Sequence, residues 1–220
     1  MPNLWYVWFM CGRFALSHAY FEKMMKELGI ALPNEPSYHP HYNISPGQKH
    51  WMVYKENANL CAVQGVWGIS PSWMRSGQLL FNAKIETVTE KSTFKKAYTL
   101  HRCAVPINGF FEWVKEGQVK QPYYFHRLND EIFFLAGIYF IEKNAKHFVI
   151  MTTKANERMK PYHHRMPIVL TAKHTSDWLS AKALLERESF ADVQGLLEAR
   201  KVTTRVNSGK VDDPECIAPL

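Results

Sequence analysis

The sequence predicts one α+β domain with largely antiparallel strands and a few helices. Many short segments alternate apolar and polar residues or form brief apolar runs, as strands do, whereas few show apolar residues at helical spacing. Helices and strands do not alternate along the chain, so a parallel sheet built from βαβ units is not indicated. The 220 residues fit a single domain, and they include no internal repeat and no low-complexity linker.

Residues 1–9 form an apolar and aromatic extension ahead of that domain, which we place at residues 10–220. The extension has neither the basic region nor the small-residue cleavage site of a secretory signal. It is also far too short to cross a bilayer. Two interpretations stay open: the extension is an edge strand, or translation begins at Met10 and Met1 is an upstream start that the cell does not use.

The first helix is expected between Ser17, a residue type suited to the N-cap, and Gly29, which ends the helix. The apolar residues between Phe21 and Leu28 recur at helical spacing and predict a face that packs on the core. Residues 31–50 are rich in Pro, Asn and His, and this composition predicts a loop.

Strands are expected through the middle of the chain, together with a short helix that contains Phe94 to Ala97. One of these strands would place Asn82, Lys84 and Glu86 on a single face, because side chains alternate along a strand. The expected strands lie at residues 50–54, 59–67, 81–86, 122–127, 131–140 and 147–153.

The C-terminal part of the chain is expected to return to helices. Helical patterns cover about residues 175–186 and 190–199, and Thr175 or Ser176 is suited to cap the first of them. A short strand is then expected over residues 202–206.

Charge and aromatic content favour a polyanionic partner. The formal net charge is +7, and the chain holds 7 Trp, 10 Tyr and 13 Phe. Lys and Arg bind phosphates, and aromatic rings stack on unpaired bases, so this composition fits a single-stranded nucleic acid. No apolar stretch approaches the length of a membrane span, and we expect no membrane partner.

Four cysteines are present, and none forms a CxxC pair of the kind that marks zinc ribbons or thioredoxin-type sites. Cys61 and Cys103 lie in apolar runs and are expected in the core. Without a recognisable secretory signal, we expect a reducing, cytoplasmic location with free thiols.

Other common chemistries are not signalled. The 10 histidines are scattered, without HExxH or paired Cys/His spacing, so no metal is expected. The sequence contains no Walker pattern, no GxGxxG loop and no GxSxG nucleophile elbow, and no cofactor is expected.

Cys11 directly follows Met10, as a small second residue follows an initiator methionine that is removed. Removal would leave Cys11 with a free α-amine and a thiol on adjacent carbons, a 1,2-aminothiol that condenses with aldehydes to a thiazolidine. Both groups have a nucleophilic fraction near neutral pH, since their reference pKa values are about 7.7–8.0 and about 8.5. The alternative is that Cys11 is simply a small core residue.

Glu112 is flanked by Phe110, Phe111 and Trp113. Partial desolvation among these rings would raise its pKa toward the range useful for proton transfer. A glutamate paired with a cation on a strand is the alternative. His163 is expected at the entrance of a strand, where a histidine serves either catalysis or structure.

Several short motifs together resemble the SOS-response-associated peptidase (SRAP) family, which shields abasic sites in DNA. The resemblance runs from Met10 to about Asn207. In order, the motifs are Cys11-Gly12-Arg13-Phe14, Tyr42-Asn43 with Pro46-Gly47, Trp67-Gly68 with Pro71, Asn82-Ala83-Lys84 with Glu86, Gly109-Phe110-Phe111-Glu112-Trp113, His163-x-Arg165-Met166-Pro167 and Val206-Asn207.

The resemblance implies one compact domain with a largely antiparallel, partly barrel-like sheet, and a cleft for single-stranded DNA that contains abasic sites. It implies a monomer, associated with the nucleoid when bound to DNA. Cys11, made N-terminal, would attack the ring-opened deoxyribose aldehyde and shield the lesion as a thiazolidine crosslink.

By the same resemblance, Asn82 would hold the cysteine and the sugar, Glu112 would transfer protons, and His163 would assist ring opening or its reversal. Residues expected to contact DNA are Arg13, Asn43, Trp73, Lys84, Trp113 and Arg165.

Three positions depart from the family pattern. His41 and Lys84 stand where arginine is common, and His164 stands where an acidic residue is common. Lysine binds phosphate as a point charge and lacks the bidentate geometry of arginine. We take His163 as the catalytic histidine because it keeps the family spacing to Arg165.

Two other classes of function stay open. The first is a thiol peptidase acting through Cys11, including self-processing that exposes Cys11, or a related lyase-type activity on DNA. The second is a protein that binds single-stranded or modified DNA without covalent chemistry.

Overall fold

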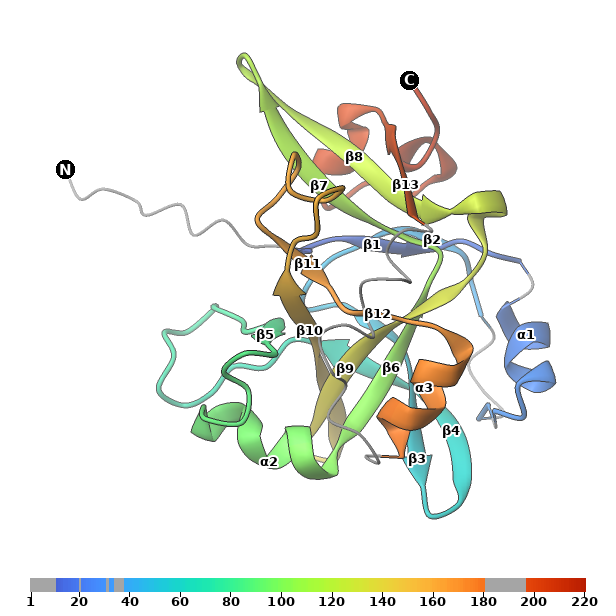
Figure 1. Ribbon diagram of the computed structural model, residues 1–220, viewed down its shortest axis with the longest axis vertical. Helices are drawn as coiled ribbons and strands as arrows, with labels where there is room; N and C mark the ends of the chain where they lie inside the picture. The colour runs from blue at the N-terminus through green and yellow to red at the C-terminus, as the bar shows by residue number, and fades with distance from the viewer. Residues whose placement is uncertain (1–10, 20, 31, 34–37, 181–196) are drawn as a thin grey trace.

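The computed structural model describes residues 11–19, 21–30, 32–33, 38–180 and 197–220. Its strands form two sheets, which lie one above the other in Figure 1. The smaller, five-stranded sheet has the order β13-β8-β7-β1-β2. Its strands are β1 (Phe14–Leu16), β2 (His41–Ile44), β7 (Gly109–Glu116), β8 (Val119–Arg127) and β13 (Leu197–Lys201).

The larger sheet has eight strands and is partly closed into a ring. The ring runs β10-β4-β3-β6-β9 and returns to β10 through a β9–β10 pairing. Its strands are β3 (Lys49–Glu56), β4 (Asn59–Trp67), β5 (Asn82–Lys84), β6 (Arg102–Ile107), β9 (Phe133–Glu142), β10 (Ala145–Lys154), β11 (Arg165–Pro167) and β12 (Val169–Leu170). Apart from the β10 pairings with β4 and β5, which are parallel, the described pairings are antiparallel. This architecture confirms the predicted α+β fold, with a ring-like sheet that is not a true barrel.

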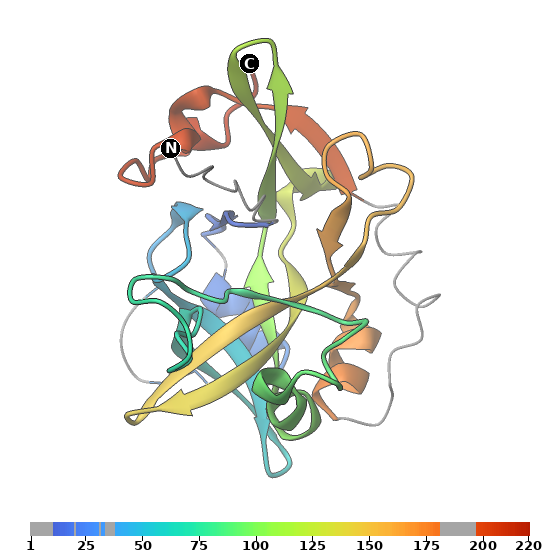
Figure 2. The same ribbon diagram turned by 90° about the vertical axis from the view of Figure 1, so that its left-hand side faces the viewer.

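Three α-helices flank the sheets in the described part of the chain: α1 (Phe21–Glu27), α2 (Ser92–Leu100) and α3 (Ala172–Leu179). Helices α2 and α3 lie at the end of the ring opposite the β7–β8 hairpin (Figures 1 and 2). The core inside the ring holds large side chains such as Trp67, Phe148 and Met52, which are fully buried. Burial of this apolar surface is the main contribution to stability. Within the described residues no helix is long and apolar enough to cross a membrane.

The first helix ends as predicted but begins later. Gly29 follows α1 in a left-handed conformation, with φ +66°, and its N–H donates to Lys26 O at 3.0 Å. Ser17, however, does not cap the helix, which starts at Phe21. Its backbone N–H instead donates to Asn108 Oδ1 at 2.8 Å, so Ser17 fixes the end of β1 to the β6–β7 junction.

Several predicted boundaries are wrong because pairing with distant strands outweighs local pattern. Residues 41–44, predicted as loop, form β2 by pairing with β1. Residues 197–199, predicted as helix, belong to β13 and pair with β8. Of the strand predicted at residues 202–206, only an isolated bridge from Val202 to Pro219 is present.

The cap predicted for the third helix is also displaced. Thr171 caps α3, because its Oγ1 accepts the N–H of His174 at 3.1 Å, so the helix begins before Thr175 and Ser176. The rest of the two predicted C-terminal helices, residues 181–196, lies outside the described residues. Two short 3₁₀ turns, Thr204–Asn207 and Pro214–Cys216, follow β13.

Candidate functional site

The pairing of β1 with β7 brings Cys11 to Glu112. Phe14 lies opposite Phe110, and the N–H of Phe111 donates to Arg13 O at 3.0 Å. This pairing places Cys11, which lies three residues before Phe14, against β7 beside Glu112. There the backbone N–H of Cys11 donates to Glu112 Oε1 at 2.8 Å.

Glu112 is 3% exposed, and this burial raises its pKa to about 8, although the hydrogen bond from Cys11 and the charge of Lys120 act in the opposite direction. A carboxyl group with such a pKa exchanges protons readily near neutral pH. The raised pKa agrees with the prediction that the aromatic residues next to Glu112 in sequence desolvate its carboxyl group. Burial, with a smaller contribution from Glu112, also raises the pKa of the Cys11 thiol, which is thus protonated.

A cleft of about 280 Å³ opens beside this pair. Its lining is aromatic and cationic: Gly12, Arg13, Pro46, Phe81, Trp113, Lys120 and Asn207. The guanidinium of Arg13 lies 6.0 Å from the centroid of Trp113, and the ammonium of Lys120 lies 5.5 Å from it. Such a combination of rings and cations suits stacked bases and phosphates.

Asn207 fixes two walls of the cleft. Trp113 Nε1 donates to Asn207 Oδ1 at 2.6 Å, and Asn207 Nδ2 donates to the carbonyl oxygen of Lys120 at 3.0 Å. One amide therefore joins both strands of the β7–β8 hairpin to the C-terminal 3₁₀ turn. The orientation of the indole ring is set by this bond before any ligand arrives.

Asn43 is buried, and its side chain bonds within the protein. It is 1% exposed, and its Nδ2 donates to Ser208 O at 2.9 Å and to Val211 O. Its Oδ1 accepts a hydrogen bond from Arg13 Nη1, which also donates to Val206 O at 3.0 Å. In this arrangement Asn43 positions Arg13 and the C-terminal segment, and its contact with DNA stays a prediction.

Arg165 is likewise occupied within the protein. Its Nη1 and Nη2 donate to the two carboxylate oxygens of Glu86 at 2.9 Å each, and Nη2 donates to Thr152 O at 2.8 Å. The Arg165 side chain is only 8% exposed. In this arrangement Arg165 links β11 to the segment that follows β5, and its contact with DNA stays a prediction.

His163 is buried, and its Nδ1 contacts the backbone of Arg165. In one tautomer Nδ1 accepts the Arg165 N–H at 3.0 Å, and in the other it donates to the Arg165 carbonyl oxygen at 3.3 Å. Burial and the neighbouring His164 lower the pKa of His163. Its Nε2 is buried and has no hydrogen-bond partner among the described residues. The adjacent ring of Tyr162 packs 4.9 Å from Tyr123, which lies opposite Glu112.

The other predicted site residues, Asn82, Lys84 and Trp73, lie in β5 or in the loop before it. Asn82 begins β5 directly after Phe81, whose ring faces Gly12 in the cleft. The side chain of Lys84 at the end of β5 is exposed. Trp73 is 67% exposed in the loop before β5. The neighbour of Asn82, Phe81, thus lies in the cleft, whereas no described contact links Trp73 to it.

Sequence reasoning missed the contribution of Lys120 and Phe81 to the cleft. Lys120 was detectable only from the hairpin register, in which Gly117 marks the turn and Lys115 lies opposite Lys120.

No described group of three or more His, Cys, Asp or Glu side chains could hold a metal ion.

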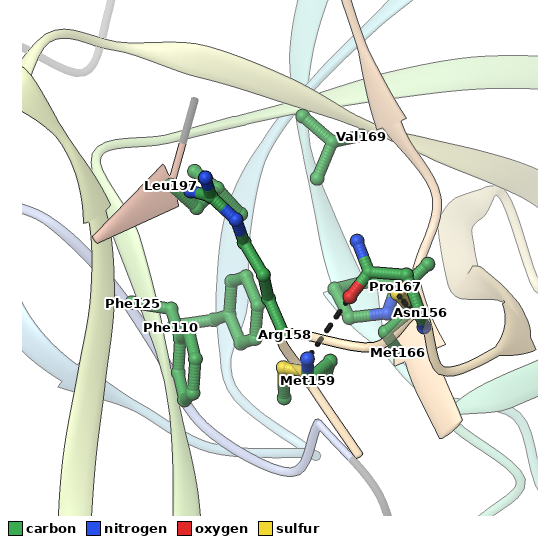
Figure 3. Close-up of a pocket in the computed structure, with 9 residues that line it drawn as sticks. All are labelled: Phe110, Phe125, Asn156, Arg158, Met159, Met166, Pro167, Val169 and Leu197. Atoms are coloured by element: carbon green, nitrogen blue, oxygen red, sulfur yellow. Dashed lines mark hydrogen bonds between the residues drawn. The ribbon is translucent and has the colours of Figure 1, made fainter. Parts of the chain in front are cut away.

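A second cavity, shown in Figure 3, is apolar and small, about 30 Å³. That volume corresponds to roughly one water molecule and cannot hold a nucleotide. Its lining comes from β7, β8, β11, β12, β13 and the loop before β11: Phe110, Phe125, Asn156, Arg158, Met159, Met166, Pro167, Val169 and Leu197. The first cleft is therefore the candidate site.

The fold and site define an α+β protein in which a cysteine near the start of the chain is held against a buried carboxyl group, at the edge of an aromatic and cationic cleft. The family model described as SOS response associated peptidase (SRAP) matches residues 10–209. The chain belongs to this family, as its motifs predict.

Similar proteins match over nearly the whole chain. Abasic site processing protein YoqW of Bacillus subtilis is 33% identical, over 94% of this chain and 99% of its own length. Abasic site processing protein YedK of Escherichia coli is 28% identical, over 96% and 100%. A solved structure from Bacteroides thetaiotaomicron shares the fold, with a TM-score of 0.73 at 23% identity, covering 96% of this chain and 100% of that one.

Proposed function

We propose that this protein processes abasic sites in single-stranded DNA, and that it does so by trapping them covalently on Cys11. The observation that carries the proposal is the 2.8 Å contact between the nitrogen of Cys11 and Glu112. The relatives named abasic site processing proteins support the choice of substrate. The cleft supports an unpaired strand, because bases must be free to reach Trp113.

The reaction needs a proton shuttle at the Cys11 nitrogen. Glu112, as a carboxylate, accepts a proton from the α-ammonium group of a chain that begins at Cys11. The free amine attacks C1′ of the ring-opened sugar and forms a carbinolamine. Glu112, now protonated, donates its proton to the departing hydroxyl, which leaves as water. The resulting iminium returns its N–H proton to the Glu112 carboxylate and becomes the imine. The pKa of about 8 suits both directions of transfer.

Ring closure completes the crosslink. The protonated Cys11 thiol adds to the imine carbon, its sulfur forming the C–S bond while its proton passes to the nitrogen. The balance is one aldehyde and one aminothiol giving one thiazolidine and one water. Holding the amine and aldehyde in one cleft adds a proximity contribution to the rate.

His163 and Asn82 act on the sugar in this proposal. In the tautomer that carries its proton on Nε2, neutral His163 is a buried donor to the ring oxygen or the O4′ hydroxyl, where it assists opening of the sugar or its reversal. Asn82, which follows Phe81 at the cleft, holds the reacting groups. Arg13, Trp113, Lys84 and Trp73 contact the strand.

The chemistry requires that residues 1–10 be absent from the reacting chain. With Met10 attached, the Cys11 nitrogen is a planar amide whose lone pair is delocalised into the carbonyl. Such a nitrogen cannot form an imine. The reacting protein in this proposal begins at Cys11.

A self-processing step is a second candidate, supported by the same contact. Protonated Glu112 lies at the nitrogen that would leave if the Met10–Cys11 bond were cut, so it can donate a proton to that leaving amine. Intact mass of purified protein over time tests this step: wild type loses residues 1–10 and Glu112→Gln does not. Equal rates of loss in both would assign the cut to another agent.

A denaturing gel with an abasic oligonucleotide tests the main proposal. Wild type should give a covalent band, and Cys11→Ala should give none while it still retards undamaged single strands on a native gel, since phosphate contacts supply most non-covalent affinity. Cys103→Ala, which changes a buried cysteine of the core, is the matched control and should crosslink. Crosslinking by Cys11→Ala would contradict the proposal.

A further inference from the structure

The β7–β8 hairpin carries two lysines that the proposed chemistry does not use. Lys115 and Lys120 lie directly opposite each other across the hairpin, and both side chains are exposed. Like charges in such a pair destabilise an isolated hairpin. A negatively charged ligand laid along this face would remove that repulsion.

Among the described residues no carboxylate forms an ion pair with either lysine. Glu116 is next to Lys115 in sequence but points to the other face of the hairpin. There its two oxygens are taken by Lys201 Nζ at 2.6 Å and by the Tyr123 hydroxyl at 2.7 Å. Within the described residues neither lysine has an ion-pair partner.

The lysine face is continuous with the cleft. Trp113 precedes Lys115 by two residues and shares its face, and Lys120 itself lines the cleft with its ammonium over the indole ring, 5.5 Å from the centroid. Asn207 holds both the indole nitrogen and the Lys120 carbonyl in place. A strand whose base stacks near Trp113 would therefore meet these cations as it leaves the cleft toward the hairpin tip (Figure 1).

We infer that Lys115 and Lys120 form a phosphate-binding extension of the cleft, which holds the single strand on one side of the lesion. The inference deepens the proposed function and rests on the cleft being its DNA site. The partner is the sugar–phosphate backbone of a single strand, recognised by charge and without regard to base sequence.

The test measures binding of an undamaged oligothymidine to the full chain over a range of salt concentrations. Lys115→Gln/Lys120→Gln should weaken binding about tenfold at low salt and reduce the salt slope by about 1.4, that is about 0.7 for each lost phosphate contact on a single strand. Melting temperature should stay at or above that of the wild type, because a like-charge pair is removed.

The control removes the same charge elsewhere. Lys55 near the β3–β4 turn and Lys143 in the β9–β10 turn are exposed at the other end of the molecule from the β7–β8 tip (Figures 1 and 2). Lys55→Gln/Lys143→Gln should leave the salt slope within experimental error of wild type. Equal slopes for the two double variants would overturn the inference, because the effect would then come from net charge alone.

Failure of the inference and failure of the proposed function are distinguishable. Oligothymidine has no aldehyde, so the slope measurement is independent of crosslinking. Crosslinking is then compared for two oligonucleotides, one with its abasic site near the 5′ end and one with it near the 3′ end. Lys115→Gln/Lys120→Gln should reduce crosslinking of one oligonucleotide more than of the other, and the more affected one identifies the side of the lesion that the hairpin holds. Equal sensitivity of both would contradict a one-sided extension.

Discussion

The backbone nitrogen of Cys11 and Oε1 of Glu112 lie 2.8 Å apart although 101 positions separate the residues in the chain. The β1–β7 pairing creates this contact, and burial of Glu112 gives it a pKa of about 8. An amine nucleophile at that nitrogen would find its proton acceptor already in place.

Glu112→Gln should slow crosslink formation by about 10²-fold, because the amide keeps the shape of the carboxyl group but cannot transfer a proton. The wild-type rate should show a pH limb near 8, the pKa of Glu112, and the variant should lose that limb. Single-turnover crosslinking between pH 6 and 9 measures both effects. A variant that reacts at the wild-type rate with the same pH profile would remove Glu112 from the mechanism.

Glu112 should also make stability depend on pH. Its folded pKa of about 8 lies above the ordinary glutamate value of 4.5, so its stabilising contribution is present below about pH 4.5 and is lost as pH rises through about 8. Glu112→Gln should therefore gain stability over the wild type between pH 5 and 9, by roughly 5 kcal/mol at most. Denaturant unfolding of chains that retain residues 1–10 measures it. A constant difference across this range would contradict the raised pKa.

His163 and His164 form a matched pair for mutation, since one is buried and the other exposed. His163→Ala should slow formation or reversal of the crosslink by about 10²-fold, because the buried Nε2 donor is lost. His164→Ala should react nearly as the wild type. Time courses of formation and of release decide the assignment, and a slow His164 variant beside a normal His163 variant would reverse it.

Arg165→Lys separates positioning from phosphate binding. Lysine cannot reproduce the two bonds to Glu86, so unfolding free energy should fall by about 2 kcal/mol and crosslinking should weaken with it. The salt slope for DNA binding should stay unchanged. Lys84→Gln, at an exposed position on the neighbouring strand, should do the reverse: normal stability and a smaller slope. A smaller slope for Arg165→Lys would restore Arg165 as a phosphate ligand.

Local pattern predicted most strands and the helix around Phe94, because those segments carry their own periodicity. It also marked Glu112 through its aromatic neighbours. It could not show that Asn43 and Arg165 are buried and bonded within the protein, since burial and partners such as Glu86 are set by strands distant in sequence. The same limit explains β13, which forms only because β8 offers it an edge.

The state of the Cys11 nitrogen is the central claim. A chain that retains residues 1–10 has an amide there and should be inactive, whereas one that begins at Met10 should react once that methionine is removed. Intact mass and peptide mapping of the species crosslinked to an abasic oligonucleotide measure this directly. We predict an adduct whose protein part begins at Cys11 and is joined through it. An adduct on a chain that still carries residues 1–10 would contradict the account, because another nucleophile would then form the bond.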